Sequence, residues 1–265
     1  MKKDIRVLII EDDPYALDLM SLLLTRDWRT RVIAELDSKE AFADYIRTEE
    51  LKLDVVILDT EMPGAPNLPS ELAAMTQRLS ASPAILYTCT RPCSIPLEQT
   101  LSVGCGGYVL KQELRYALAS AVASIKDGHC VITPGVKALV GDASFPSGTR
   151  VLDGRRQWSI FTPREREVLR LAIIFNLAVR DMADELVLSS GWVSEIVSEI
   201  YKKLGVRDIL SGEAPLEDFF SDETVLAHCR QITARDNPDK RKSRKAPWMS
   251  TLAFHLLTMP EIEIL

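Results

Sequence analysis

Short, continuous apolar runs in the first half of the chain constrain its fold more than any other feature of the sequence. Four of these runs are clear and one is weaker: Ile5–Ile10, Asp54–Leu58, Ala84–Tyr87 and Gly107–Leu110, and Arg31–Ala34. Continuous rather than alternating runs of Val, Ile and Leu are typical of strands that are buried on both faces of a parallel sheet. Helical patterns lie between the runs, near residues 14–26, 38–49, 68–80, 94–103 and 112–127. This alternation predicts right-handed βαβ units, and therefore an open α/β sheet with helices on both faces.

The length of 265 residues fits two domains. Five strands and five helices have the size of a flavodoxin-like domain with a five-stranded parallel sheet, which we place at residues 1–140. Residues 141–159 are rich in glycine and serine and have little apolar periodicity, which indicates a linker. A capped helix start at Thr162 and a helix end at Gly205 indicate a small all-α domain at residues 160–210. Residues 211–265 form a C-terminal extension whose role the sequence does not indicate.

The composition excludes several classes of protein. Hydrophobic residues make up 46% of the chain and charged residues 26%, which excludes fibrous and wholly disordered chains. The five cysteines lack CxxC or histidine spacing, so we expect neither a disulfide framework nor a zinc site. The apolar runs are too short for a membrane span or a signal peptide. We therefore expect a cytoplasmic protein that does not associate with a membrane.

Carboxylates follow two of the predicted strands at the point where each strand ends. Glu11 and Asp12 come directly after the first strand, and Asp59 follows the third. Ligands of a doubly wound sheet bind outside the carboxyl ends of its strands, so these side chains should converge. Carboxylates in one cleft repel one another unless a hard cation such as Mg²⁺ neutralises them. Thr88 and Lys111 end the fourth and fifth strands, and they add a hydroxyl group and a positive charge that suit phosphoryl chemistry.

The same segments resemble the receiver domain of two-component response regulators. The matching stretches are VLIIEDDP (7–14), VVILDTEMPG (55–64), ILYT (85–88) and GCGGYVLK (104–111). The resemblance implies that Asp59 accepts a phosphoryl group from a histidine kinase. It also implies that Glu11, Asp12, Asp59 and the backbone carbonyl of Glu61 hold Mg²⁺.

Three further roles follow from the same resemblance. Lys111 would contact the phosphoryl group. Thr88 and Tyr108 would form a switch pair, in which the hydroxyl group moves toward the new phosphate and the ring turns inward behind it. A receiver of this kind changes only its own phosphorylation, so we do not expect an enzyme that acts on a separate substrate.

Residues 160–207 resemble a LuxR/NarL-type helix-turn-helix output domain. The match rests on FTPREREVLRLA (161–172), on Met182-Ala183-x-x-Leu186 with Leu188-Ser189, and on Lys203-Leu204-Gly205-Val206. Two features depart from the family pattern. One extra residue precedes the scaffold helix near 176–179, and the recognition helix begins with Trp192-Val193-Ser194-Glu195-Ile196 where Thr-Val-Lys is usual.

Two functions are compatible with this architecture. The first is transcription control by DNA binding after phosphorylation, as a homodimer, with candidate DNA contacts at Ser194, Glu195, Ser198, Lys202, Lys203 and Arg207. The second is a phosphorylation-controlled regulator whose helix-turn-helix has lost or reduced DNA binding and which binds a protein through its helical domain or tail. Residues 160–207 carry seven basic and seven acidic side chains, whereas DNA-binding modules are usually basic. The basic run Lys240–Lys245 either adds phosphate contacts or is a solvated segment.

Overall fold

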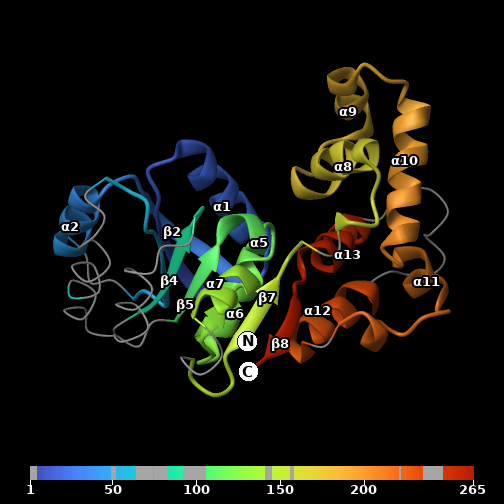
Figure 1. Ribbon diagram of the computed structural model, residues 1–265. Coiled ribbons are helices and arrows are strands. Elements are labelled where there is room, and N and C mark those ends of the chain that lie inside the picture. The colour runs from blue at the N-terminus through green and yellow to red at the C-terminus, as the bar shows by residue number, and fades with distance from the viewer. Residues whose placement is uncertain are drawn as a thin grey trace. The chain divides into compact units, whose positions relative to one another are not determined.

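The apolar runs of the first half form the strands of one sheet in the computed structural model (Figure 1). The structure describes residues 5–48, 52–63, 74, 83–91, 106–140, 145–155, 158–220, 222–234 and 247–265. The chain divides into two units: unit 1 is Met1–Arg155 with Pro260–Leu265, and unit 2 is Arg156–Met259. The C-terminal residues therefore belong to the same unit as the N-terminal ones.

Unit 1 is built on an eight-stranded sheet in the order β2-β1-β3-β4-β5-β6-β7-β8. The strands are β1 (Ile5–Ile10), β2 (Thr30–Leu36), β3 (Val55–Asp59), β4 (Ala84–Cys89), β5 (Gly107–Leu110), β6 (Val131–Ile132), β7 (Arg150–Asp153) and β8 (Glu261–Ile264). All neighbouring strands are parallel except β7 and β8, which are antiparallel. The predicted parallel sheet is confirmed by β1 to β5, and three short strands extend it at one edge.

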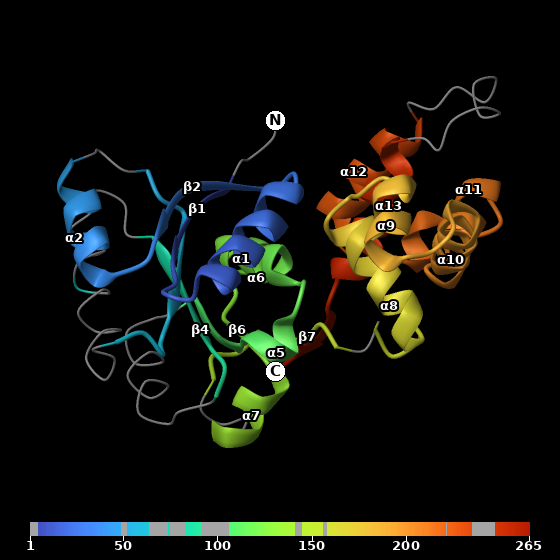
Figure 2. The ribbon, with the colours of Figure 1, turned by 90° about the horizontal axis from the view of Figure 1, so that it is seen from above.

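Helices cover both faces of this sheet. They are α1 (Pro14–Arg26), α2 (Lys39–Thr48), α5 (Lys111–Leu114), α6 (Leu118–Lys126) and α7 (Pro134–Val140). Helices α1 and α6 lie together on one face, and α2 lies on the other (Figure 2). Phe42 of α2 packs in a buried cluster with Leu8 and Leu58 on one face of the sheet. The residues that precede these two in their strands, Val7 and Ile57, are buried as well. Both faces of the strands are thus apolar, which explains why their sequences do not alternate.

Three of the expected helices differ from the structure in extent or lie outside the described residues. The segments 68–80 and 94–103 fall outside the described residues, apart from residue 74. The expected helix at 112–127 is divided into α5 and α6, because Arg115 has a φ of 50° that ends α5 after four residues. A positive φ is uncommon for a residue with a side chain. As a result, α5 is a separate turn that begins at Lys111.

The described residues of unit 2 are helical. Its elements are α8 (Pro163–Leu169), the π-helix η3 (Arg170–Ile174), α9 (Val179–Leu186), α10 (Ser190–Lys203), α11 (Val206–Ser211), the 3₁₀-helix η4 (Leu216–Asp218), α12 (Glu223–Ala234) and α13 (Pro247–Thr258). Val168, Met182, Val193 and Ile200 are buried in its core. They come from α8, α9 and α10, so the apolar skeleton of the predicted helix-turn-helix is packed as expected.

The predicted ends of the helices in unit 2 are confirmed. The Thr162 hydroxyl group accepts from the Glu165 backbone N–H at 3.3 Å, and the Glu165 carboxylate accepts from the Thr162 N–H at 2.8 Å. This reciprocal pair satisfies two N–H groups that the first turn of α8 leaves free. Gly205 follows α10 with a φ of 72°, and a Cβ atom there would lie 2.3 Å from the Phe219 ring. Glycine is the residue that fits both constraints.

The extra residue expected before the scaffold helix coincides with η3. In this π-helix the Phe175 N–H donates to the Arg170 carbonyl at 2.9 Å, which spans five residues rather than four. A π-turn takes one additional residue into a helix without breaking its hydrogen-bonded ladder. Asn176 follows with a φ of 57° and leads the chain into α9. The insertion therefore changes the end of one helix and leaves α9 and α10 in place.

The structure assigns elements to the segments on both sides of the predicted helical domain. Residues 141–159, expected to be a linker, contain β7, whose Val151 and Leu152 are buried. The extension 211–265 contributes η4, α12 and α13 to unit 2 and returns to unit 1 as β8. Strands β7 (RVLD) and β8 (EIEI) each contain only two apolar residues, so neither has the continuous apolar run by which the other strands are recognised. None of the described helices has the length and apolar character that crossing a membrane requires.

Candidate functional site

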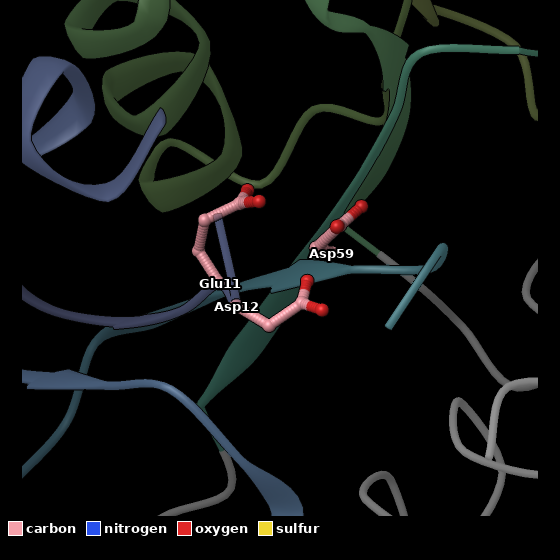
Figure 3. A group of neighbouring side chains, drawn as sticks. All are labelled: Glu11, Asp12 and Asp59. Carbon is pink, nitrogen blue, oxygen red and sulfur yellow. The ribbon is translucent and has the colours of Figure 1, made fainter. Parts of the chain in front are cut away.

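The carboxyl ends of β1 and β3 place three carboxylates together. The two strands pair in parallel, with Ile10 opposite Leu58, so the residues that follow them emerge at the same edge of the sheet. Oxygen atoms of Glu11, Asp12 and Asp59 all lie within 4.8 Å of one another. Figure 3 shows the three side chains grouped at this edge. Glu11 and Asp59 are buried and Asp12 is exposed, so the group opens to solvent on one side.

Lys111, the first residue of α5, adds a positive charge to this group. Its Nζ lies 2.8 Å from Glu11 Oε2 and 3.3 Å from Asp59 Oδ2. Strand β5 delivers Lys111 to the site, because β5 lies beside β4 and β4 lies beside β3. Burial by itself lowers the pKa of a lysine, but the contacts with Glu11 and Asp59 outweigh it and raise the pKa of Lys111. The ammonium group is therefore firmly charged.

The site contains more negative charge than Lys111 neutralises. Burial raises the pKa of Glu11 to about 7, although the hydrogen bond from Lys111 opposes the rise. Burial also raises the pKa of Asp59, again against the attraction of Lys111. A raised pKa means that the ionised carboxyl group is unfavourable in its surroundings. The arrangement therefore favours an added cation, and its oxygen donors suit a hard divalent ion.

Thr88 and Tyr108 lie behind the carboxylates in the core. Thr88 is opposite Asp59 in the register of β3 and β4, and its buried hydroxyl group donates to the Leu58 carbonyl at 3.4 Å. The Tyr108 ring is fully buried and stacks on Tyr87, with ring centroids 6.4 Å apart. The Tyr108 ring therefore already lies in the inward position that we expected it to take.

Glu61 is close to Asp59 but its side chain points to another loop. The Glu61 backbone N–H donates to Asp59 Oδ1 at 3.2 Å. Its carboxylate accepts from the backbone N–H groups of Thr90 and Arg91, at 2.5 Å and 3.2 Å. This side chain ties the loop after β3 to the loop after β4. From the sequence we expected only the Glu61 carbonyl to take part in the site; no local pattern indicates the role of its side chain.

A cavity adjoins the site and was not expected from the sequence. It has a volume of about 330 Å³ and lies between α1 and the segment from α5 to the start of α6. Thr88 and Lys111 form one wall, and Leu19, Met20 and Leu114 contribute apolar surface. The apolar side chains belong to different helices, so no local pattern in the sequence brings them together.

The expected DNA-binding residues lie on and beside α10. Trp192, Glu195, Glu199 and Lys202 form its exposed stripe, while Ser194 and Ser198 are half-buried. Lys202 Nζ lies 3.6 Å from Glu199 Oε1, and Arg207 contacts the Ser198 hydroxyl group. The stripe therefore carries two acidic groups and one basic group.

Lys203 has a different environment from its neighbour Lys202. Its Nζ lies 2.7 Å from both carboxylate oxygens of Glu165, the residue that caps α8. Burial raises the pKa of Glu165, but the hydrogen bonds from Lys203 and Thr162 outweigh it and lower the pKa. Lys203 thus joins α10 to α8, and its charge is largely neutralised within unit 2.

Comparison with known proteins adds a family to this geometry. The model of the response regulator receiver domain matches residues 7–123. The uncharacterized transcriptional regulatory protein YvfU of Bacillus subtilis is 30% identical over 205 residues, which cover 77% of this chain and 92% of YvfU. The transcriptional regulatory protein DesR of the same organism is 27% identical over 204 residues, with the same coverage. Among solved structures, the response regulator ChrA of a heme-sensing two-component system is 24% identical, with a TM-score of 0.41, covering 86% of this chain and 98% of ChrA.

Proposed function

This chain belongs to the response regulators, and from that membership we propose that it controls transcription in response to phosphorylation of Asp59. The observation that carries the proposal is the convergence of Glu11, Asp12, Asp59 and Lys111 at one edge of the sheet. The relatives that match both of its halves are transcriptional regulatory proteins.

The buried carboxylate of Asp59 is suited to act as the nucleophile. One of its oxygens attacks the phosphorus of a phosphohistidine or a small phosphodonor; the new O–P bond forms as the bond to the donor breaks. The donor is most simply a histidine kinase, as in two-component systems. Lys111 Nζ, 3.3 Å from Asp59 Oδ2, is in reach of the phosphoryl oxygens.

The site fits a Mg²⁺ ion. Its donors are carboxylate oxygens within 4.8 Å of one another, and burial disfavours the ionisation of Glu11 and Asp59 when no further cation is present. Glu11, Asp12 and Asp59 would hold the ion, with the Glu61 carbonyl as a fourth ligand. When bound, Mg²⁺ neutralises charge on the carboxylates and on the phosphoryl oxygens.

Phosphorylation changes the partners of two groups next to Asp59. The phosphoryl group brings a charge of about −1.5 to −2 at neutral pH. Lys111, now shared between Glu11 and Asp59, turns to the phosphoryl oxygens, and the Thr88 hydroxyl group exchanges its long bond to the Leu58 carbonyl for one to the phosphate. The Tyr108 ring is already buried and keeps its inward position. These movements convert a local charge into a conformational change.

The output is DNA binding through α10, in a homodimer formed after phosphorylation. The recognition helix of a helix-turn-helix lies in the major groove, and a dimer reads two half-sites about one turn apart. Ser194, Ser198 and Glu195 are placed to reach base edges, with Glu195 accepting from a cytosine amino group. Lys202 and Arg207 contact phosphates, whereas Lys203 contributes less because Glu165 holds it.

A second candidate is a regulator that binds a protein through the same helix. The observation in its favour is the exposed stripe of α10, where Trp192 is 49% exposed and stands beside Glu195. An exposed aromatic ring suits a protein interface. Selection from a random duplex pool with phosphorylated protein separates the two candidates, because only the DNA-binding regulator enriches a sequence motif.

Phosphorylation itself is tested by intact mass after incubation with a small phosphodonor and Mg²⁺. The wild-type chain should gain one phosphoryl group, and a chelator should prevent the gain. Asp59→Asn should gain none, whereas Asp44→Asn, which changes an exposed carboxylate on α2, should behave as the wild type. Full labelling of Asp59→Asn would remove Asp59 from its role.

A further inference from the structure

Unit 2 is inserted between two neighbouring strands of the sheet in unit 1. The chain leaves unit 1 after β7 and returns to it at Pro260, immediately before β8. In the antiparallel pair, Asp153 at the end of β7 is opposite Glu261 at the start of β8. The two connections to unit 2 therefore start from adjacent positions. We call the pair β7–β8 the stalk; the two strands lie side by side in Figure 1.

Backbone hydrogen bonds and an ion pair hold the end of the stalk that is opposite to its connections with unit 2. The Leu265 N–H donates to the Thr149 carbonyl at 3.0 Å, and the Leu265 carbonyl accepts from the Gly148 N–H at 2.9 Å. Lys137 Nζ of α7 lies 2.7 Å from Glu263 Oε1. The C-terminus is thus held by backbone pairing and by an ion pair, and β8 is part of the sheet.

Helix α5 holds the other end of the stalk, where the chain leaves β7 for unit 2. The Gly154 N–H donates to the Glu113 carbonyl at 2.9 Å, and Arg155 Nη1 lies 2.7 Å from Glu113 Oε1. The other carboxylate oxygen of Glu113 accepts from the Gly135 N–H at 2.7 Å. Glu113 is buried, so its carboxylate is committed to these two partners. One side chain of α5 therefore joins the end of β7 to the start of α7.

The contact between α5 and the stalk leaves no free space. A Cβ atom on Gly154 would lie 2.2 Å from the Leu114 carbonyl oxygen. Real Cβ atoms do not approach backbone atoms so closely, so any side chain at this position must move α5 or β7. A displacement of α5 must likewise be accommodated by Gly154 and Arg155.

The other end of α5 lies in the phosphorylation site. Lys111 is its first residue, and Glu113 is two residues further on in a helix of only four residues. A single turn closed by hydrogen bonds moves nearly as one piece. A change of partner by Lys111, from Glu11 and Asp59 to a phosphoryl group, would therefore act on one end of this turn, and Glu113 lies at the other end.

We propose that α5 transmits phosphorylation of Asp59 to the stalk, with Glu113 as the positioning residue and its ion pair with Arg155 as the contact that loosens. This inference rests on the proposed phosphorylation of Asp59. It assigns to the C-terminal strand a function beyond packing: β8 makes the attachment of unit 2 double, so a change at Glu113 acts on both connections at once.

The test is hydrogen exchange of the backbone amides of β7 and β8 in the full chain, with and without a small phosphodonor and Mg²⁺, alongside intact mass. In the wild type, phosphorylation should speed exchange in the stalk by roughly fivefold or more, the range of ordinary coupling between sites. Arg155→Gln should be phosphorylated to the same extent but show less than a twofold further change. Arg47→Gln, which breaks an exposed ion pair on α2, should respond as the wild type.

Each outcome bears on one of the two proposals. If the wild type gains no phosphoryl group, the proposed function fails and this inference falls with it. If it is fully phosphorylated and exchange in the stalk is unchanged, the inference alone is overturned, as it is if Arg155→Gln responds like the wild type. Gly154→Ala is a second test variant, because its methyl group must displace α5 or β7 without changing a charge. It should also remove the response while labelling persists; a normal response in a folded Gly154→Ala chain would contradict the proposal.

Discussion

The charged groups of the proposed phosphorylation site in unit 1 and those of α10 in unit 2 have opposite environments. Glu11 and Asp59 are buried with one shared lysine, and their raised pKa values reflect the shortage of positive charge. Along α10 the basic groups have acidic partners in the same unit, as with Lys203 and Glu165. The first region therefore favours an added cation. The second has little net attraction for a polyanion.

Because of this difference, the two regions should bind their ligands through different interactions. A site with unsatisfied buried charge binds a small ion strongly because the ion removes an existing penalty. A neutral recognition helix gains little from phosphates and must depend on shape, on base contacts and on pairing with a second copy. DNA binding by this chain should therefore depend more on dimerisation than it would in a protein with a basic recognition surface.

The largest effect on stability is expected from Glu165→Ala. The substitution removes the reciprocal cap of α8 and leaves Lys203 without its partner, so the free energy of unfolding of unit 2 should fall by about 2–4 kcal/mol. Glu167→Ala, at an exposed ion pair with Arg164, should change it by less than about 0.5 kcal/mol. Chemical denaturation followed by a signal of unit 2 measures both. Equal effects would mean that the charges of unit 2 are not stabilising pairs.

The folded pKa of Glu165 lies below its unfolded value. Its contribution should therefore be complete above the unfolded pKa of about 4.3 and should be lost as the pH falls through the folded pKa. The difference between wild type and Glu165→Gln in unfolding free energy should shrink in that acidic range. A difference that grows on acidification would contradict the sign of the shift.

Addition of Mg²⁺ should stabilise unit 1 and leave unit 2 unchanged. At a concentration one hundred times its dissociation constant, an ion that binds only the folded state adds about 2.7 kcal/mol. Chelation should reverse the gain, and Asp12→Asn should reduce it, because Asp12 is one of the three carboxylates. Calorimetry with and without Mg²⁺ measures the effect. An equal shift for both units would show that the ion acts on the protein in general.

Glu11→Gln should make unit 1 more stable in the absence of Mg²⁺, which is the reverse of the effect in unit 2. Burial raises the pKa of Glu11 from its ordinary value of 4.5 to about 7 in the folded protein. Wild-type stability should consequently decline as the pH rises through this interval, and the neutral amide should remove that decline, with a gain of about 1–2 kcal/mol at pH 8. Unfolding curves at pH 5 and pH 8 test it; a loss of stability at pH 8 would show that the Lys111 contact dominates.

The smallest effect is expected from single phosphate contacts on α10. Lys202→Ala should weaken binding to all DNA sequences alike and reduce the log–log salt slope by about 0.9. Lys203→Met should leave the slope nearly unchanged and lower stability, because Lys203 is already paired with Glu165. Titrations at several salt concentrations separate the two lysines. A slope that depends equally on both would show that Lys203 leaves Glu165 when DNA binds.

The residues at the strand ends could be predicted from the sequence because parallel strands align their carboxyl ends. Once the runs at Ile5–Ile10 and Val55–Asp59 are recognised as neighbouring strands, Glu11 and Asp59 must meet. The helix start at Thr162 could be predicted for a similar reason, since its partners are three residues apart. In both cases local patterns determine the geometry.

The features that could not be predicted depend on residues far apart in the chain. The pairing of β7 with β8 joins residues more than one hundred positions apart, and neither strand has a continuous apolar run. The ion pair between Lys203 and Glu165 also requires tertiary packing, and no local pattern in the sequence indicates it. The break between α5 and α6 depends on the backbone of Arg115, in a stretch whose apolar pattern continues without interruption.

Control of DNA binding by Asp59 is tested most directly by measuring the affinity for a duplex that has been enriched from a random pool. The affinity is measured for the wild type and for Asp59→Asn, each after incubation with a small phosphodonor and Mg²⁺. The wild type should bind this duplex at least about tenfold more tightly after phosphorylation, which is within the usual range of coupling between sites. Asp59→Asn should bind weakly and without change. Equal affinity of the two proteins for the duplex, with the wild type fully phosphorylated by mass, would contradict control by Asp59.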